Sequence, residues 1–237
     1  MPRIARPAHK CVILSGGTPR LARPAHNCVI LSGGTPRLAR PAQSKDAMTS
    51  NLDLEGELQN RGALLQGHFK LSSGRHSDRF IQKFRILEDS ALLEPIGREI
   101  AARFKQASPT IVVSAAVGGI LLGYEVARAL GTKAIFVEKE GGVPVLRRNF
   151  ALAPSDRALV VEDVVTTGGS VKEVIDVVRS HGAQVVGVGI IVERAPADFG
   201  VRTEALLRMP IVSYDAADCP QCLRGEPIAD PGSRRAK

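Results

Sequence analysis

The segment RALVVEDVVTTGGSVKEVI, residues Arg157–Ile175, decides the fold of this chain. It starts with an apolar run typical of a buried strand, Ala158–Val161, and continues through two adjacent carboxylates, Glu162 and Asp163. A small polar run, Thr166–Ser170, then leads into an amphipathic helix. Backbone N–H groups and the helix dipole at such a turn bind phosphate. Two acids beside the turn would repel a bare phosphate, but they suit a ligand that also carries hydroxyls, such as a phosphorylated ribose.

Three other interpretations of this segment are weaker. A nucleotide-binding P-loop requires Gly-x-x-x-x-Gly-Lys-Ser/Thr, and no Lys stands at that place. A dinucleotide-binding turn requires G-x-G-x-x-G, which the segment lacks. The remaining alternative is an ordinary strand, turn and helix with surface acids and Ser170 as the N-cap. The order of apolar strand, acid pair, Thr-Thr-Gly-Gly-Ser and helix favours ligand binding over this alternative.

Short apolar strands alternate with helical patterns on both sides of the segment. This alternation predicts an α/β fold with a mostly parallel central sheet covered by helices on both faces. Ligands in such sheets bind at the carboxyl ends of the strands, where the segment places its turn. The expected elements are helices at about 53–65, 92–104 and from 119 to a stop at Gly131, strands at 110–113, 134–137 and 184–192, β-like stretches at 69–71 and 79–82, and a loop at 138–150.

Composition and charge exclude two classes of function. The chain is 44% hydrophobic with seven Phe, two Tyr and no Trp, so its core is aliphatic. No apolar run approaches the roughly 18 residues that a membrane span needs, and no membrane partner is expected. The net charge of +8 lies almost entirely in residues 1–47, where eight basic side chains and one acid give +7. The remaining +1 for residues 48–237 leaves no basic surface for a nucleic acid.

A repeat fills most of the first 47 residues. The stretch 5–21 recurs at 22–38 with a single mismatch, Lys10 against Asn27. Folded repeats usually diverge and have periods of about 20 residues or more, so near identity over 17 residues indicates a recent duplication. We expect residues 1–47 to be a disordered extension, Met48 to be the physiological start and residues 48–237 to form the folded domain. An Arg-rich targeting peptide is the alternative.

The run Arg157–Ile175 resembles the phosphoribosyl-pyrophosphate (PRPP) motif of the type I phosphoribosyltransferases. The stretch Phe69–Ser77, followed by Phe80–Lys83, is similar to the N-terminal hood of the orotate phosphoribosyltransferases, with the hood expected at about 66–88. The resemblance covers roughly residues 52–237 and implies the type I phosphoribosyltransferase fold. It further implies transfer of ribose 5-phosphate from PRPP to orotate, which gives orotidine 5′-monophosphate and pyrophosphate in UMP biosynthesis.

The resemblance also implies roles for individual residues. It implies Mg²⁺ as the cofactor, held mainly by PRPP and water rather than by protein side chains. Arg194 follows an apolar strand, and a guanidinium there can bind a planar carboxylate in bidentate fashion; a surface pair with Glu193 or Asp198 is the alternative. The implied catalytic residues are Lys139, Arg148 and Asp163; the PRPP-binding residues are Glu162, Asp163, Val164, Val165, Thr166, Thr167, Gly168, Gly169, Ser170 and Lys139; the orotate-binding residues are Thr166, Arg194, Phe80 and Ile81.

The segment 138–150 departs from the better-known family pattern. It carries Lys139, Arg147 and Arg148 but no His, and Ser72 stands where many relatives have Lys. Small residues at 115–119 offer backbone N–H groups to pyrophosphate. The family implies a homodimer in which loop 138–150 reaches the neighbouring site. Another type I phosphoribosyltransferase, for a purine or uracil, and a non-catalytic PRPP-binding regulator are the alternatives, and the missing His is the best argument for the regulator.

Four cysteines divide into two pairs. Cys11 and Cys28 belong to the N-terminal repeat, whereas Cys219 and Cys222 form a Cys-Pro-Gln-Cys motif in a tail at about 215–237. One C-x-x-C motif supplies two of the four ligands of a structural zinc. A zinc half-site completed across a dimer, a reducible disulfide and two turn cysteines without a partner are all open, and we expect the last. This cysteine usage fits a reducing cytoplasm.

Overall fold

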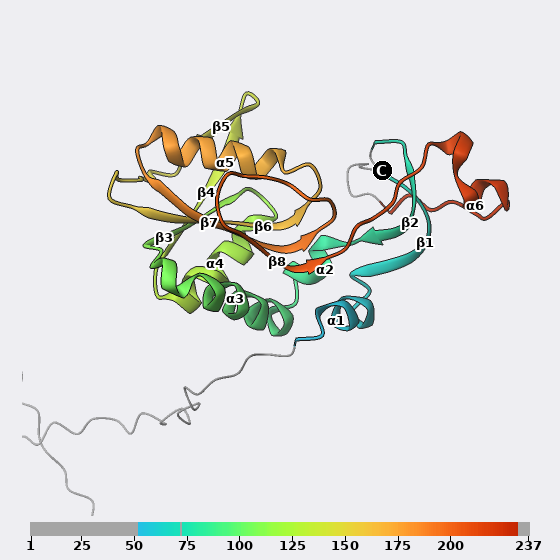
Figure 1. The fold of residues 1–237 in the computed structure, drawn as a ribbon, viewed down its shortest axis with the longest axis horizontal. Coiled ribbons are helices and arrows are strands. Elements are labelled where there is room, and N and C mark those ends of the chain that lie inside the picture. Colours follow the sequence, from blue (N-terminus) through green and yellow to red (C-terminus); the bar gives the residue numbers. More distant parts are fainter. Residues whose placement is uncertain (1–51, 72, 232–237) are drawn as a thin grey trace, which may run out of the picture. The chain divides into compact units, whose positions relative to one another are not determined.

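The computed structural model describes residues 52–71 and 73–231 of the chain. The N-terminal repeat, Met48 and Ser72 lie outside the described residues, so the predictions made for them stay predictions. The elements follow the chain in this order (Figure 1): α1 Leu54–Asn60, β1 Leu64–Lys70, β2 His76–Ile81, α2 Lys83–Leu87, α3 Ser90–Phe104, the 3₁₀ turn η1 Lys105–Ala107, β3 Ile111–Ala115, α4 Gly119–Leu130, β4 Lys133–Glu140, β5 Val143–Leu146, β6 Arg157–Val165, α5 Gly169–Ser180, β7 Gln184–Glu193, β8 Thr203–Arg208, η2 Ala216–Asp218 and α6 Pro220–Leu223.

The central sheet has six strands in the order β5-β4-β3-β6-β7-β8, and every pair is parallel except β4 and β5. Helix α5 covers one face, and α3 and α4 cover the other (Figure 1). Strand β6 shows why both faces are covered: Leu159 and Val161 pack toward α3 and α4, whereas Ala158 and Val160 pack toward α5. Alternate side chains of a strand point to opposite faces, so an uninterrupted apolar strand requires helices on both. The predicted mostly parallel sheet is confirmed.

The sheet topology brings the loops that follow β3, β6 and β7 to one edge. These three strands are adjacent and parallel, with Ser114 opposite Val161 and Val165 opposite Glu193. Their carboxyl ends therefore point in the same direction. The residues that follow them, 116–118, 166–168 and Arg194, form a single rim that can hold one ligand.

A second, two-stranded sheet is formed by β1 and β2, which pair antiparallel. It lies within the region expected to form the hood. The C-terminal segment adds to both of its strands: Ala229 bridges Phe69, and Tyr214 bridges His76. Two-stranded sheets are marginally stable alone, so these contacts are part of what holds the hood together.

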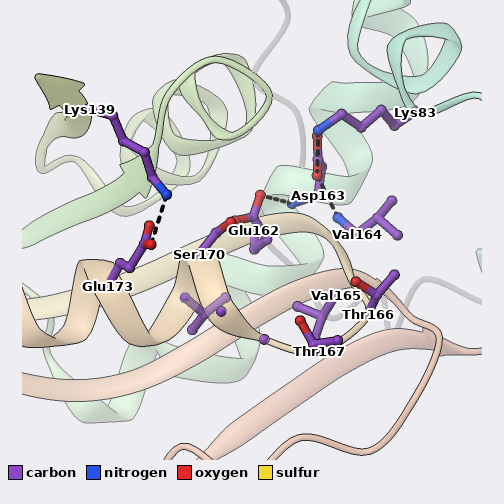
Figure 2. A pocket seen from close by; sticks show the side chains of 13 residues that line it. Lys83, Lys139, Glu162, Asp163, Val164, Val165, Thr166, Thr167, Ser170 and Glu173 are labelled. Carbon is purple, nitrogen blue, oxygen red and sulfur yellow. Dashed lines mark hydrogen bonds and ion pairs between the residues drawn. The ribbon is translucent and has the colours of Figure 1, made fainter. Parts of the chain in front are cut away.

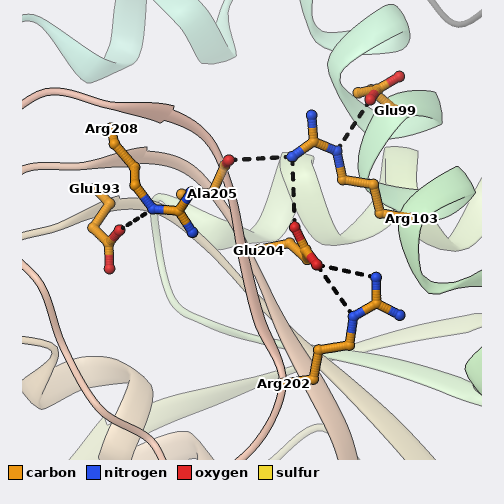
Figure 3. Close-up of polar contacts among 7 residues, drawn as sticks. All are labelled: Glu99, Arg103, Glu193, Arg202, Glu204, Ala205 and Arg208. Atoms are coloured by element: carbon orange, nitrogen blue, oxygen red, sulfur yellow. Dashed lines mark hydrogen bonds and ion pairs between the residues drawn. The ribbon is translucent and has the colours of Figure 1, made fainter.

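Strand β8 forms the far edge of the central sheet and had no counterpart in the predicted elements. Figure 3 shows how charged side chains attach it to the rest of the sheet. Arg103 of α3 donates to the Ala205 carbonyl at 3.2 Å, and Arg208 pairs with Glu193 of β7 at 3.0 Å. Such charges also protect an edge strand from pairing with other chains.

Several boundaries differ from those predicted, and two of these differences have a clear local cause. The first helix ends at Asn60 rather than near residue 65, because Gly62 takes a positive φ of 64° and the chain then enters β1. The predicted loop 138–150 is largely a hairpin, in which β4 runs to Glu140 and β5 returns antiparallel to it. Gly141 and Gly142 both have positive φ, which suits the tight turn between such strands.

No helix among the described residues is long and apolar enough to cross a bilayer.

Candidate active site

The acid pair lies at the carboxyl end of β6 and is deeply buried. Glu162 is 7% exposed and Asp163 is 1% exposed. Asp163 Oδ1 accepts a hydrogen bond from its neighbour's amide, Val164 N, at 2.6 Å. Asp163 Oδ2 lies 3.0 Å from Lys83 Nζ, yet it makes no hydrogen bond to any described residue (Figure 2). A buried carboxylate oxygen in this state is available to a hydroxyl donor from a ligand.

Burial of Glu162, followed by repulsion from Asp163, raises the pKa of Glu162 to about 8. Glu162 Oε1 accepts a hydrogen bond from Asp163 N at 3.2 Å, and this bond only partly offsets the effect. In the free protein at neutral pH, Glu162 therefore carries a proton. Raised carboxyl pKa values of this kind gather at functional sites.

The turn after β6 has backbone N–H groups that no side chain caps. Gly168 is the N-cap of α5 with φ 77°, and no side chain caps the helix. The alternative in which Ser170 serves as the N-cap is therefore wrong, and Ser170 is exposed together with Thr166 and Thr167. The first amides of a helix lack partners within the helix, so they point toward whatever occupies the turn.

Gly168 is required by its surroundings as well as by its backbone angle. A Cβ at this position would lie 2.7 Å from Phe199 Cε1 and 3.2 Å from Ala197 Cβ. Phe199 is itself buried. The loop after β7 thus packs under the turn and fixes its shape.

Two adjoining hollows open at this edge of the sheet. The first, of about 310 Å³, contains the acid pair and the turn, and the second, also open, has about 330 Å³. They share Lys139, Ser170 and Glu173, so they form one cleft. The first is lined by Lys83, Lys139, Glu162–Val171 and Glu173; the second is lined by Ala115–Val117, Val137–Lys139, Pro144, Ser170, Glu173 and Val174.

All nine residues predicted at 162–170 line the first hollow, and Lys139 lines both. Lys139 Nζ lies 2.8 Å from Glu173 Oε1, on the opposite side of the hollow from Lys83 (Figure 2). The 57% exposure of the Lys139 side chain leaves it free to turn toward a ligand. The structure thus brings Lys139 to the acid pair and the turn.

Lys83 is a site residue that the sequence motif included without assigning it a role. It follows β2, lines the first hollow and pairs with Asp163. A Cβ on Gly118 would lie 2.2 Å from Asp163 Oδ2 and 2.7 Å from Lys83 Nζ, so the small-residue loop after β3 lies against this ion pair. The Ala116–Val117 peptide bond in this loop is cis. Sequence spacing gives no signal for the pair, because 80 residues separate its members.

Arg148 does not line either hollow in this chain. Its guanidinium pairs with Glu138 through two contacts of 3.0 and 3.1 Å, which raise the pKa of Arg148 and lower that of Glu138. The Arg148 side chain is 62% exposed. Arg148 thus lies on the outside of the hairpin region.

Arg194 follows the carboxyl end of β7 and lines neither hollow, although its backbone adjoins the end of β6. Its amide donates to the Val165 carbonyl at 2.8 Å, while its Nε is buried without a hydrogen-bond partner among the described residues. Burial lowers the pKa of Arg194. The acids proposed as alternative partners are engaged elsewhere, since Glu193 pairs with Arg208 and Asp198 accepts from Gly200 N. Arg194 thus has a half-buried guanidinium with an unsatisfied donor.

The two hood residues predicted to contact orotate lie outside the two hollows. Ile81 is 9% exposed and belongs to the core that contains α3 and α4. Phe80 is partly exposed, and its ring packs on Phe69 with a centroid separation of 5.8 Å.

Comparisons with known proteins agree with this geometry. Residues 85–203 match the family model of the phosphoribosyl transferase domain. The chain is 51% identical over 179 residues to an orotate phosphoribosyltransferase of Pelotomaculum thermopropionicum. The aligned region covers 75% of this chain and 94% of that relative. An orotate phosphoribosyltransferase of Desulforamulus reducens is 49% identical over 176 residues, with 73% and 92% covered.

Solved structures give the same result. The crystal structure of orotate phosphoribosyltransferase from Aeropyrum pernix is similar with a TM-score of 0.56 and 28% identity, covering 65% of this chain and 93% of that one. This similarity agrees with the mostly parallel sheet flanked by helices described above. The chain therefore belongs to the orotate phosphoribosyltransferase family.

Proposed function

We propose that this chain transfers ribose 5-phosphate from PRPP to orotate, giving orotidine 5′-monophosphate and pyrophosphate in pyrimidine biosynthesis. The observation that carries the proposal is one cleft that combines a buried acid pair with an uncapped helix N-terminus. The unsatisfied guanidinium of Arg194 beside it adds a group for an acidic base. PRPP would thus find hydrogen-bond acceptors for its ribose hydroxyls and N–H donors for its phosphate. The acidic base would find a cation.

The turn and the acid pair hold the ribose phosphate. The N–H groups and hydroxyls of Thr166–Ser170 bind the 5-phosphate, and the dipole of α5 favours its charge. Asp163 Oδ2, which pairs with Lys83 but makes no hydrogen bond to the described residues, accepts from a ribose hydroxyl. Glu162 contributes the second acceptor once it loses its proton. Fixing the sugar at both ends places its C1 carbon between the leaving group and the base.

Cations on two sides of the cleft stabilise the leaving pyrophosphate. As the bond to pyrophosphate breaks, C1 becomes cation-like and negative charge builds on the leaving oxygen. Lys139 lies at the junction of the two hollows, where the second hollow receives the pyrophosphate. Lys83 reaches the same region from the hood, and a ribose hydroxyl that takes over Asp163 frees the Lys83 ammonium for the leaving anion. Such preplaced charges lower the barrier to departure.

Orotate lies on the opposite side of C1 from the pyrophosphate. Arg194 binds its carboxylate, and the Thr166 side chain contacts the ring. Phe80 and Ile81 border this side as part of the hood, with Ile81 contributing its backbone because its side chain is in the core. Burial lowers the pKa of Arg194 because the charged guanidinium loses contact with water. A bound carboxylate replaces that water and therefore stabilises the charged form.

The residues present fit a Mg²⁺ ion carried by the substrate. Glu162 and Asp163 are the two carboxylates that lie together at the turn, and Asp163 Oδ2 makes no hydrogen bond to the described residues. Two carboxylates supply too few oxygens for an ion that takes six, so PRPP and water would provide the rest. When bound, Mg²⁺ neutralises charge on the pyrophosphate.

A homodimer in the cytoplasm completes the proposal. Val117, Leu121 and Tyr124 are 71%, 51% and 61% exposed, and they form an apolar stripe at the start of α4. Leu121 and Tyr124, three residues apart, lie on one face of α4, and Val117 belongs to the loop just before the helix. A second copy of the chain that covers this stripe also brings its 138–150 segment, with Arg148, toward the neighbouring cleft. Tyr124→Glu is expected to give monomers by light scattering, whereas the matched Val212→Glu, on an equally exposed residue, is not.

Pyrophosphate release from PRPP, measured separately with orotate, adenine, hypoxanthine and uracil, tests the proposed function. We expect release with orotate alone among the four bases. Release with one of the other bases would assign the chain a different acceptor. Binding of PRPP without release in any of the four would point to a regulator.

A further inference from the structure

Four side chains with metal-binding atoms meet where the C-terminal segment contacts the hood. His68 comes from β1, His76 from β2, and Cys219 and Cys222 flank the first turn of α6. Their ligand atoms all lie within 4.8 Å of one another. None of the four lines the PRPP cleft, so the cluster is a separate feature. The expectation that the two cysteines have no partner is wrong.

The separations within this His68–His76–Cys219–Cys222 cluster are close to those of a tetrahedral metal site. Zinc bonds of about 2.3 Å to sulfur and about 2.0–2.1 Å to nitrogen, at tetrahedral angles, set ligand atoms about 3.3–3.8 Å apart. The two imidazole nitrogens, His68 Nε2 and His76 Nδ1, are 3.1 Å apart. Cys219 Sγ is 3.5 Å and Cys222 Sγ is 3.6 Å from His68 Nε2, and Cys222 Sγ is 3.2 Å from His76 Nδ1.

A neighbouring hydrogen bond sets the tautomer of His68. Its other nitrogen, Nδ1, lies 3.0 Å from the backbone carbonyl of Glu226. A carbonyl only accepts, so Nδ1 must carry the proton and Nε2 must present a lone pair to the cluster. Metal-binding histidines usually donate their second N–H in this way. The cluster thus offers the lone pair of His68 Nε2, a second imidazole and two thiols. A cation that prefers sulfur ligands can bind this set of donors.

Burial indicates a structural rather than a catalytic metal. His68, His76 and Cys219 are 5%, 6% and 0% exposed, and Cys222 closes the outer side. Two His and two Cys fill all four positions of a tetrahedral ion, so no position is left for a substrate. The donor set of two thiolates and two imidazoles favours zinc over magnesium or calcium, which prefer oxygen.

We propose that His68, His76, Cys219 and Cys222 form a structural zinc site that fastens the C-terminal segment to the hood. The two histidines reach the site from both strands of a two-stranded sheet; Cys222 belongs to a helix of four residues, and Cys219 is the N-cap of that helix. None of these elements has a large core of its own. A zinc ion links them within one chain, and the hydrogen bonds of Ala229 to the His68 carbonyl and of Tyr214 to the His76 carbonyl, both 2.8 Å, flank it.

The site also bears on the cleft through β2. This strand begins at His76 in the cluster and ends at Ile81, two residues before Lys83. Loosening the cluster therefore frees the strand that positions the Lys83 ammonium against Asp163. Zinc removal is expected to lower thermal stability first and to weaken Lys83 placement as a consequence.

Zinc content is measured on the full chain, and substitution of the other two cysteines serves as the control. Cys11→Ser/Cys28→Ser leaves Cys219 and Cys222 as the only thiols, and Cys219→Ser/Cys222→Ser removes the same number from the cluster. Each protein is purified without a metal-binding tag and analysed for zinc by plasma mass spectrometry. We expect about one zinc per chain in the wild type and in the Cys11/Cys28 variant, and a loss of at least tenfold in the Cys219/Cys222 variant.

Cobalt titration keeps the proposal testable if the cluster variant does not fold. After zinc is removed by a chelator under reducing conditions, Co²⁺ is added to the Cys11→Ser/Cys28→Ser protein. We expect thiolate-to-cobalt charge-transfer bands and the strong visible bands of tetrahedral cobalt, with the melting temperature restored. A zinc-free wild type that also gives no thiolate–cobalt bands would overturn the proposal, as would full zinc retention after loss of both cluster cysteines.

Discussion

The PRPP cleft and the His68–His76–Cys219–Cys222 cluster both gather polar side chains, but they differ in how those side chains are satisfied. In the cleft, Asp163 Oδ2 makes an ion pair with Lys83 but no hydrogen bond, and no side chain caps the first amides of α5 within the described part of the chain. In the cluster, four donor atoms, three of them from buried residues, lie close to one another and converge on a common centre. The first arrangement suits a substrate that comes and goes, and the second suits an ion that stays.

This difference separates activity from stability. Groups that wait for a substrate cost stability in the free protein, so neutralising them should not unfold it. Groups that bind a metal stabilise the free protein, so removing them should destabilise it. Substitutions in the cleft test the first half of this comparison.

Asp163→Asn is expected to have the largest effect. The amide cannot replace the carboxylate as a double acceptor for the ribose and leaves Lys83 without its ion pair. We expect kcat/KM for PRPP to fall by about 10²–10³-fold while the melting temperature stays the same or rises. Steady-state kinetics and thermal melts measure both. Asp176→Asn, on the exposed face of α5, is the matched control, and a large loss of stability in Asp163→Asn would break the comparison.

Arg194→Ala should act on the base alone. The guanidinium is half-buried with an orphan Nε, so its loss removes a charge-assisted contact to the orotate carboxylate. We expect the KM for orotate to rise by about 10–100-fold with little change in the KM for PRPP. Arg208→Ala, which removes an arginine from the neighbouring strand, is the control. Equal effects on both substrates would take Arg194 out of the base site.

Lys139→Ala should lower kcat more than it raises either KM. Lys139 is exposed and held by Glu173 in the free protein, so its contribution comes mainly when pyrophosphate develops charge. We expect a decrease of about tenfold or more in kcat. Lys172→Ala, on the exposed side of α5, controls for the lost charge. An unchanged kcat would exclude the proposed role.

Glu162→Gln should change the stability of the free protein modestly, and by an amount that depends on pH. The pKa of Glu162 is raised from 4.5 to about 8, so the stability that its proton contributes is full below pH 4.5 and is lost as pH rises through 8. Gln stays neutral throughout. We therefore expect the variant and the wild type to melt alike near pH 5 and the variant to melt higher by several degrees at pH 9. Glu88→Gln, on an exposed glutamate, should show no such trend, and a constant difference across this range would contradict the assignment.

The sequence predicted the parts of the molecule that are local. The strand, acid pair, turn and helix of Arg157–Ile175 are contiguous, so pattern and turn chemistry were enough to place nine lining residues. Strand β8 and the β4–β5 hairpin were missed because their patterns are short and partly polar, and pairing with neighbours determines them.

Contacts between distant segments could not be predicted in this way. The pair of Lys83 with Asp163 joins residues 80 positions apart, and the cluster joins Cys219 to His68 across 151. The Cys-Pro-Gln-Cys motif indicated half of a metal site, but the two histidines that complete it have no spacing that marks them as ligands. The fold alone brings the halves together.

The structure of the protein with Mg²⁺ and PRPP, determined from crystals with data at the zinc absorption edge, tests the comparison most directly. The account predicts the 5-phosphate on Thr166–Ser170, ribose hydroxyls on Glu162 and Asp163, Lys83 moved away from Asp163, and an anomalous zinc peak inside an unchanged cluster. A ribose phosphate bound elsewhere, or a cluster that opens when the cleft fills, would contradict it.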